Sequence, residues 1–158
     1  HGGSNRIYAK KGSNNDEHLS VTANIQLEKS MGLDDISIFN EFADNALQSK
    51  EELLILLNKF KNDNSKVISY GATSKSTTVF NYCDIGPELI EYITDTTPEK
   101  QGRYSPGTHI PIIDPEQGFD DTVDFAFLGA WNFAEEIKNK EKDFAGKFFT
   151  HVPVVRFI

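Results

Sequence analysis

Two polar loops of the chain contain residue types that can hold an anion. The first loop covers residues 71–77 and brings Gly71, Ser74, Lys75 and Ser76 directly after an apolar run. If a strand ends and a helix begins there, the N–H groups of the helix N-terminus, the hydroxyls and the ammonium together favour a phosphate or a carboxylate. Hydroxyl residues at such a position also cap helices for stability alone. The loop has neither of the glycine-rich patterns of dinucleotide and P-loop sites, so it does not support a site of either kind. Anion binding and helix capping both stay open.

The second loop, residues 96–108, is long for a connection inside a compact domain, which is typical of a functional or a disordered segment. Its prolines and glycines favour a fixed shape. Arginine can hold a phosphate through two hydrogen bonds and tyrosine can stack on a base or a sugar, whereas the alternative is an ordinary surface loop. The candidate ligand contacts in and beside this loop are Asp95, Lys100, Arg103, Tyr104 and His109.

A third pair of candidates, Trp131 and Asn132, follows another apolar run. The pair suits a ligand contact, and it suits equally well a core side chain followed by a helix cap. Cys83 stands in a helical context that predicts a buried, unreactive thiol. We predict no metal site, because a solvated loop explains the acidic cluster better; its members are Asp114, Glu116, Asp120 and Asp121.

Composition excludes several classes of protein. The chain has 158 residues, enough for one domain with a sizeable core, and a net charge of −8 that opposes binding to nucleic acid. The single cysteine excludes an internal disulfide and a cysteine-based zinc site. No apolar run is long enough to span a membrane, and no secretory signal pattern is present. We therefore expect a cytoplasmic location and no membrane partner.

Periodicity indicates the elements that must position these candidates. Apolar residues at helical spacing predict helices over 16–31 and 34–60, the second being one helix or two helices broken near Ser49. Further helices are expected over 75–83 and 131–143. The predicted strands are 6–9, 66–70, 89–94, 110–113, 123–129, 147–150 and 152–157.

Alternating strands and helices predict an α/β fold, a Rossmann-like three-layer domain with a mostly parallel sheet, preceded by an N-terminal helical segment. We expect a single domain, with a linking segment at 1–12, the helical segment at 13–64 and the Rossmann-like core at 65–158. In such a sheet ligands bind beyond the carboxyl ends of the strands, where all the candidate groups would gather.

Four motifs, in order along the chain, resemble a known family. They are His-Gly-Gly-Ser-x-Arg at 1–6, Tyr-Gly-Ala-Thr-Ser-Lys at 70–75, the long run 95–112 with Lys-Gln-Gly-Arg and Pro-Gly-Thr-His-Ile-Pro-Ile, and Ala-Trp-Asn at 130–132. Together they are similar to the C-terminal domain of S-adenosylmethionine-dependent nucleotide-sugar C-methyltransferases, of the sugar C-3′-methyltransferase type. The sequence departs from the family pattern at 76–78, where Ser-Thr-Thr replaces Gly-Asn-Thr.

This resemblance implies that His1 is the general base and that the candidate residues named above contact a nucleotide-linked keto-deoxysugar. It also implies that S-adenosylmethionine is bound by a domain absent from this chain, with a zinc-binding module further upstream in the same polypeptide. The chain would then be an excised or processed piece that is inactive alone. The alternatives are a stand-alone nucleotide-sugar binding module and a dimerisation domain that uses the helix at 34–60.

Overall fold

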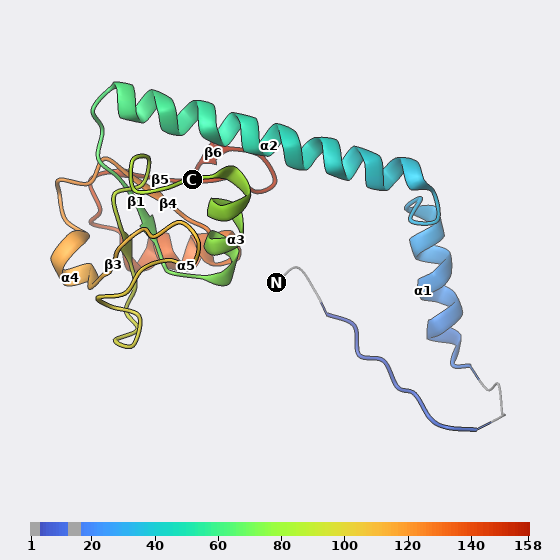
Figure 1. Cartoon of the computed structure of the whole chain (residues 1–158). Helices are drawn as coiled ribbons and strands as arrows, with labels where there is room; N and C mark the ends of the chain where they lie inside the picture. Colours follow the sequence, from blue (N-terminus) through green and yellow to red (C-terminus); the bar gives the residue numbers. More distant parts are fainter. Residues whose placement is uncertain (1–3, 13–16) are drawn as a thin grey trace. The chain divides into compact units, whose positions relative to one another are not determined.

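The computed structural model describes residues 4–12 and 17–158, and it divides into two units, one reaching to Leu47 and one from Gln48 to Ile158. The first unit contains α1 (Leu19–Ser30) and the beginning of α2 (Ile36–Asn62), both labelled in Figure 1. The predicted strand at 6–9 is wrong, because these exposed residues form no strand. An apolar run needs a strand to pair with, and residues 4–12 have no such partner in the described part of the chain.

Helix α2 runs unbroken through Ser49, so of the two alternatives, one long helix or two helices broken there, the single helix is the one that forms. The hydroxyl of Ser49 donates to the carbonyl oxygen of His151 (3.2 Å), which gives it a partner outside the helix. It therefore does not compete for the helix's own backbone groups. Along the second half of α2 the side chains of Leu53, Leu57 and Phe60 are buried.

The second unit is built on a six-stranded sheet of order β3-β2-β1-β4-β5-β6. All neighbouring strands are parallel except β5 and β6, which are antiparallel. From β1 the chain proceeds to β2 and β3 on one side and then returns to β4 and β5 on the other, which creates a switch point between β1 and β4. The strands are β1 (Val67–Tyr70), β2 (Ile93–Thr94), β3 (Ile112–Ile113), β4 (Phe125–Phe127), β5 (Lys147–Thr150) and β6 (Arg156–Phe157).

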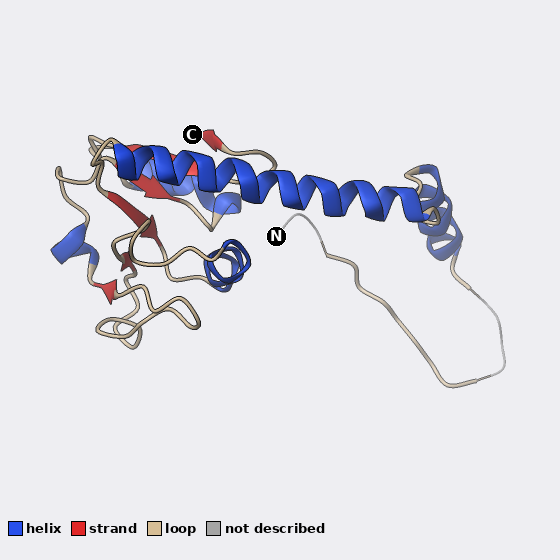
Figure 2. Ribbon diagram, turned by 45° about the horizontal axis from the view of Figure 1, so that its top comes forward, coloured by secondary structure: helices blue, strands red, loops and turns tan. Residues whose placement is uncertain are grey.

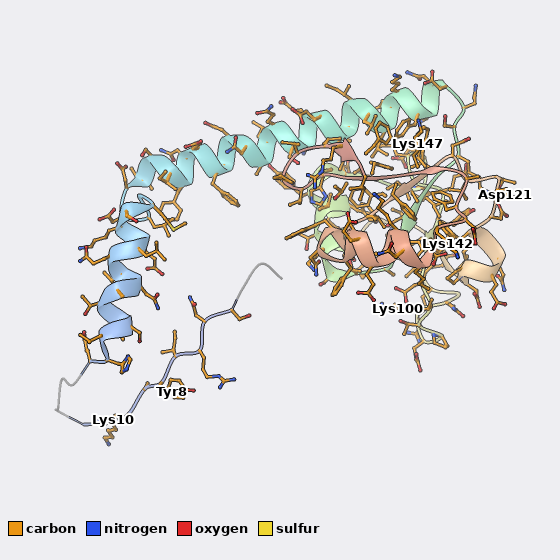
Figure 3. All side chains as sticks on the ribbon, turned by 180° about the vertical axis from the view of Figure 1, so that it is seen from behind. Tyr8, Lys10, Lys100, Asp121, Lys142 and Lys147 are labelled. Carbon is orange, nitrogen blue, oxygen red and sulfur yellow. The ribbon has the colours of Figure 1, made fainter. Side chains whose placement is uncertain are left out.

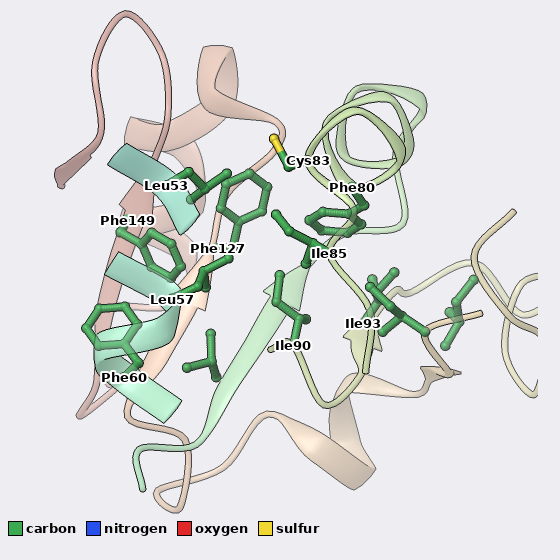
Figure 4. Packing of buried hydrophobic residues seen from close by; sticks show 13 residues of the cluster. Leu53, Leu57, Phe60, Phe80, Cys83, Ile85, Ile90, Ile93, Phe127 and Phe149 are labelled. Carbon is green, nitrogen blue, oxygen red and sulfur yellow. The ribbon is translucent and has the colours of Figure 1, made fainter. Parts of the chain in front are cut away.

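Helices cover both faces of this sheet, as Figure 2 shows. On one face α2 and α3 (Ser74–Cys83) pack on the strands, where Phe60 of α2 and Phe80 of α3 lie in one cluster with Phe127 (Figure 4). The Phe60 ring also stacks on Phe125, at 3.8 Å between ring centroids. On the other face α5 (Ala134–Lys140) contributes Ala134 and Ile137. The predicted α/β fold, with three layers, a mostly parallel sheet and a preceding helical segment, is confirmed.

Several predicted elements differ in extent, and the strands predicted at 110–113, 123–129 and 152–157 are reduced to β3, β4 and β6. The strand predicted at 89–94 is reduced to β2, because Leu89 and Ile90 form a turn in which both N–H groups donate to the carbonyl oxygen of Gly86. A short helix that the periodicity did not predict, α4 (Pro115–Gly118), begins after Asp114, whose carboxylate accepts from the N–H of Glu116. The helix predicted at 131–143 starts with a 3₁₀ turn, Trp131–Phe133, before α5.

No helix in the part of the chain that the structure describes is long and apolar enough to cross a membrane.

Candidate functional site

The loop after β1 is a tightly capped helix start. Thr73 is the N-cap of α3, and its hydroxyl oxygen accepts from the N–H of Ser76 (3.1 Å). The Ser76 hydroxyl is buried, lies 2.8 Å from the hydroxyl of Thr73 and donates to the carbonyl oxygen of Gly71. Gly129, which follows β4, leaves room for it, since a Cβ there would overlap the Ser76 side chain. The hydroxyl of Ser76 thus holds the turn together, while Ser74 is exposed.

Lys75 brings the loops after β1 and β4 together. Its Nζ donates to Oδ1 of Asn132 (2.7 Å) and lies 6.0 Å from the centroid of the Trp131 ring. A neutral amide satisfies the ammonium without cancelling its charge, and no ion pair involves Lys75 among the described residues. The sheet's switch point therefore carries a positive charge next to an aromatic ring.

Asp95, at the carboxyl end of β2, organises a second cluster. Its Oδ2 accepts from the N–H of Ala72 (2.8 Å) and from Nζ of Lys100 (3.0 Å), and its Oδ1 accepts from the N–H of Thr97 (2.9 Å). Burial alone would raise the pKa of this 8% exposed carboxyl, but the hydrogen bonds from Thr97, Lys100 and Ala72 outweigh it and lower the pKa. Lys100 also donates to the carbonyl oxygen of Ala72 (2.9 Å), so this cluster adjoins the loop after β1.

The loop predicted at 96–108 continues to Pro111 in the structure, and it is hydrogen-bonded to itself through its backbone. Beyond Gly102 it folds back on itself: the N–H of Ser105 donates to the carbonyl of Ile110, and the N–H of Ile112 donates to the carbonyl of Arg103. Its outer turn is fastened to α3, because Nδ2 of Asn81 donates to the carbonyl of Pro106 (2.9 Å). His109 has a positive φ of 57°, a conformation that is rare outside glycine.

The structure brings most of the sequence-predicted residues to the carboxyl edge of the sheet, but not into one bonded network. Two groups are directly bonded, Lys75 with Asn132 and Asp95 with Lys100. The side chains of Arg103, Tyr104 and His109 are exposed on the folded-back loop, with Tyr104 63% exposed. His1 lies outside the described residues. The described residues hold no group of three metal-ligating side chains.

Two residues of this edge were not singled out by the sequence. Asn81 anchors the loop from α3, and its partner lies 25 residues away, so no local pattern reveals it. His151 follows β5, where the rule that ligand loops come after parallel strands would have found it. Its ring stacks on Phe127 (5.5 Å), its Nδ1 is buried without a partner in the described structure, and burial lowers its pKa.

Comparison with known proteins agrees with this architecture. Residues 1–153 match the family described as "C-methyltransferase C-terminal domain". The whole chain is 33% identical, over 162 aligned residues, to the C-methyltransferase NovU of Streptomyces niveus, and it spans 39% of that protein's length. These matches confirm the resemblance that the four motifs indicated. The chain belongs to the C-methyltransferase C-terminal domain family.

Proposed function

We propose that the chain is the substrate-side domain of an S-adenosylmethionine-dependent C-methyltransferase acting on a nucleotide-linked keto-deoxysugar. The observation that carries this proposal is the arrangement of Lys75, Trp131 and Asn132 at the switch point of the sheet. The uncancelled ammonium suits a phosphate, and the indole beside it suits a sugar or a base. Both groups lie where an open parallel sheet binds its ligands.

Other residues of the same edge take supporting roles in this proposal. Ser74 joins Lys75 as an anion contact, because it is exposed at the start of α3. The hydroxyl of Ser76 positions the turn rather than the ligand, since its hydrogen bonds are internal. Gly71, with φ of +90°, provides the left-handed backbone that begins the loop.

The folded-back loop supplies the remaining contacts. Lys100 is compensated by Asp95, so the pair fixes the geometry of the loop rather than attracting an anion. Arg103, Tyr104 and His109 present exposed side chains from a rigid frame, which suits recognition of the sugar and its nucleotide.

The reaction begins at the carbon next to the ketone of the sugar, whose C–H is acidic for that reason. We assign removal of this proton to the imidazole of His1, a group suited to proton transfer near neutral pH. S-adenosylmethionine would supply the methyl group. The chain does not fit this cofactor, because none of its loops has the acidic, glycine-rich pattern expected of such a site, and we derive no step through it.

We assign the cofactor site, and a zinc-binding module, to a preceding region of a longer polypeptide. The support for this assignment is that the chain spans only 39% of its relative. We also propose a cytoplasmic location for this polypeptide, with which the single buried thiol of Cys83 is compatible.

Two measurements test the proposal. The coding sequence upstream of residue 1 should contain cysteine pairs followed by a glycine-rich strand-turn-helix pattern. The longer polypeptide should transfer a labelled methyl group from S-adenosylmethionine to a thymidine-diphosphate keto-sugar, and a His1→Ala variant should lose this activity while it still binds the sugar. Methyl transfer at the normal rate by His1→Ala would reject the general-base assignment, and failure of the longer polypeptide to bind any nucleotide-linked keto-sugar would reject the substrate class.

A further inference from the structure

The first unit has apolar side chains but no core among the residues that the structure describes. None of its described residues is buried, neither in α1 nor in the part of α2 up to Leu47. An isolated helix of 12 residues such as α1 is marginal in water without tertiary packing, so α1 needs a cover.

The exposed face of α2 continues a stripe that is covered elsewhere along the same helix. Phe39 precedes Leu57 by 18 residues, and Phe42 precedes Phe60 by the same interval. At about 3.6 residues per turn this interval is five full turns, so each pair lies on one helix face. Leu57 and Phe60 are buried in the core of the second unit, whereas Phe39 and Phe42 are 51% and 73% exposed. The stripe therefore suits apolar packing at both ends, and one end is uncovered.

Helix α1 is apolar on two opposite sides. Its apolar residues stand at every second position, and residues two apart in a helix point roughly 200° away from each other. Leu19 and Leu27 lie on one side, and Val21 and Ile25 lie on the other; all four are exposed. A helix with apolar residues on two opposite sides buries all of them only when it is covered on both sides. In a two-fold dimer of this chain, one apolar side of α1 would contact the same side of α1 in the second copy. The opposite apolar side of α1 would stay exposed.

We propose that the occupant is the upstream region of the same polypeptide, which docks its apolar surface on α1 and on the Phe39–Phe42 face of α2. This inference rests on the proposed function, in which the chain is the C-terminal part of a longer enzyme. The relative of which the chain spans 39% has room for such a region. Because the upstream region would belong to the same polypeptide as these helices, its effective concentration at them is high, on the order of millimolar for short flexible linkers.

Hydrogen–deuterium exchange tests the docking without substrate or cofactor. We expect the amides of residues 19–30 and 36–47 to exchange at least tenfold more slowly in the longer polypeptide than in the 158-residue chain. Phe42→Glu should abolish this protection in the longer polypeptide. Ile55→Glu is the matched control, because Ile55 is 70% exposed on the same helix but lies off the stripe, and it should leave the protection intact.

Three results would overturn the docking. One is equal exchange of these amides in both polypeptides. Another is slower exchange of these amides at higher concentrations of the 158-residue chain, accompanied by the mass of a dimer in light scattering. In that case a second copy of the chain would cover the helices. The third is a coding sequence with no upstream region. Exchange and methyl transfer are separate measurements. Protection of the amides without methyl transfer would reject the proposed function and support the docking. Methyl transfer without protection would reject the docking and support the proposed function.

Discussion

Asn81 of α3 and Gly107 of the folded-back loop are in direct contact. Oδ1 of Asn81 occupies the space that a Cβ at position 107 would need, while Nδ2 of the same side chain donates to the carbonyl of the preceding residue, Pro106. The backbone of Gly107 has a φ of +84°. One amide therefore holds the outer turn of the loop that carries Arg103, Tyr104 and His109.

Gly107→Ala should destabilise the second unit more than Gly102→Ala. Both glycines have positive φ, which costs an L-residue roughly 1–2 kcal/mol, but a Cβ at Gly102 meets nothing within 4 Å. The overlap with Asn81 adds to the strain only at position 107. Urea unfolding of the two variants measures the difference, and equal losses of unfolding free energy would show that the contact with Asn81 is unimportant.

Lys75→Met should weaken binding of thymidine diphosphate to the longer polypeptide by about tenfold or more, because one charge-assisted contact contributes roughly 1.5–3 kcal/mol. The measurement is titration calorimetry at fixed ionic strength. Lys147→Met is the control, since Lys147 starts β5 at the opposite edge of the sheet from Lys100 and the candidate site (Figure 3). Equal affinity of the Lys75 variant and the unmodified protein would place the anion elsewhere.

Asp95→Asn should lower the free energy of unfolding at neutral pH by about 1–3 kcal/mol, because the buried cluster loses its ionised acceptor. The pKa of Asp95 is lowered from 3.8, so its ionisation stabilises the fold fully above that pH, and this contribution is lost as the pH falls through the folded value. The variant should therefore show a shallower loss of stability in acid. An unchanged acid profile would mean that Lys100 and the backbone N–H groups do not depend on the charge.

His151→Phe should remove a different pH dependence. Burial lowers the pKa of His151 below 6.5, so the unfolded chain binds a proton more readily than the folded chain, and stability falls as the pH drops from 6.5 toward the folded value. Phenylalanine keeps a ring against Phe127 but cannot titrate. Unfolding midpoints at pH 7.5 and pH 5.5 measure the effect. The exposed His18→Phe serves as control, and a slope that persists in His151→Phe would contradict the assignment.

The sequence predicted the elements with strong periodicity and missed features that depend on distant partners. The apolar stripe of α2 was predictable from the sequence, but the partner of the Ser49 hydroxyl, a carbonyl 102 residues away, was not. The apolar run at 89–94 suits a strand and a buried turn equally, and only tertiary packing decides between them. The start of α4 had a local signal in Asp114 followed by Pro115, an N-cap before a proline at the first helical position.

The candidate site shows the same division. That ligand groups follow β1, β2 and β4 was predictable from the parallel sheet, and the structure places Lys75, Asp95 and Asn132 there. The hydrogen bonds between these residues could not be predicted, because Lys75 and its partner Asn132 are 57 residues apart in the sequence. The residue type of Ser76 suggested a ligand contact, but its hydroxyl donates to the carbonyl oxygen of Gly71 within the loop.

The folded-back loop, residues 102–112, makes most of its backbone hydrogen bonds within itself. Its two arms are joined by their own backbone hydrogen bonds, from Gly102 to Ile112 and from Ser105 to Ile110, and the loop meets α3 at Pro106 and Gly107. The loop is also held to the rest of the unit by Lys100, which precedes it and is bonded to Asp95, and by Ile110, which is buried in the core. We therefore expect that loops grafted from related domains would leave the melting temperature of the second unit nearly constant only where Asn81, Lys100, Gly107 and Ile110 are retained, while the exposed side chains between them change sugar preference.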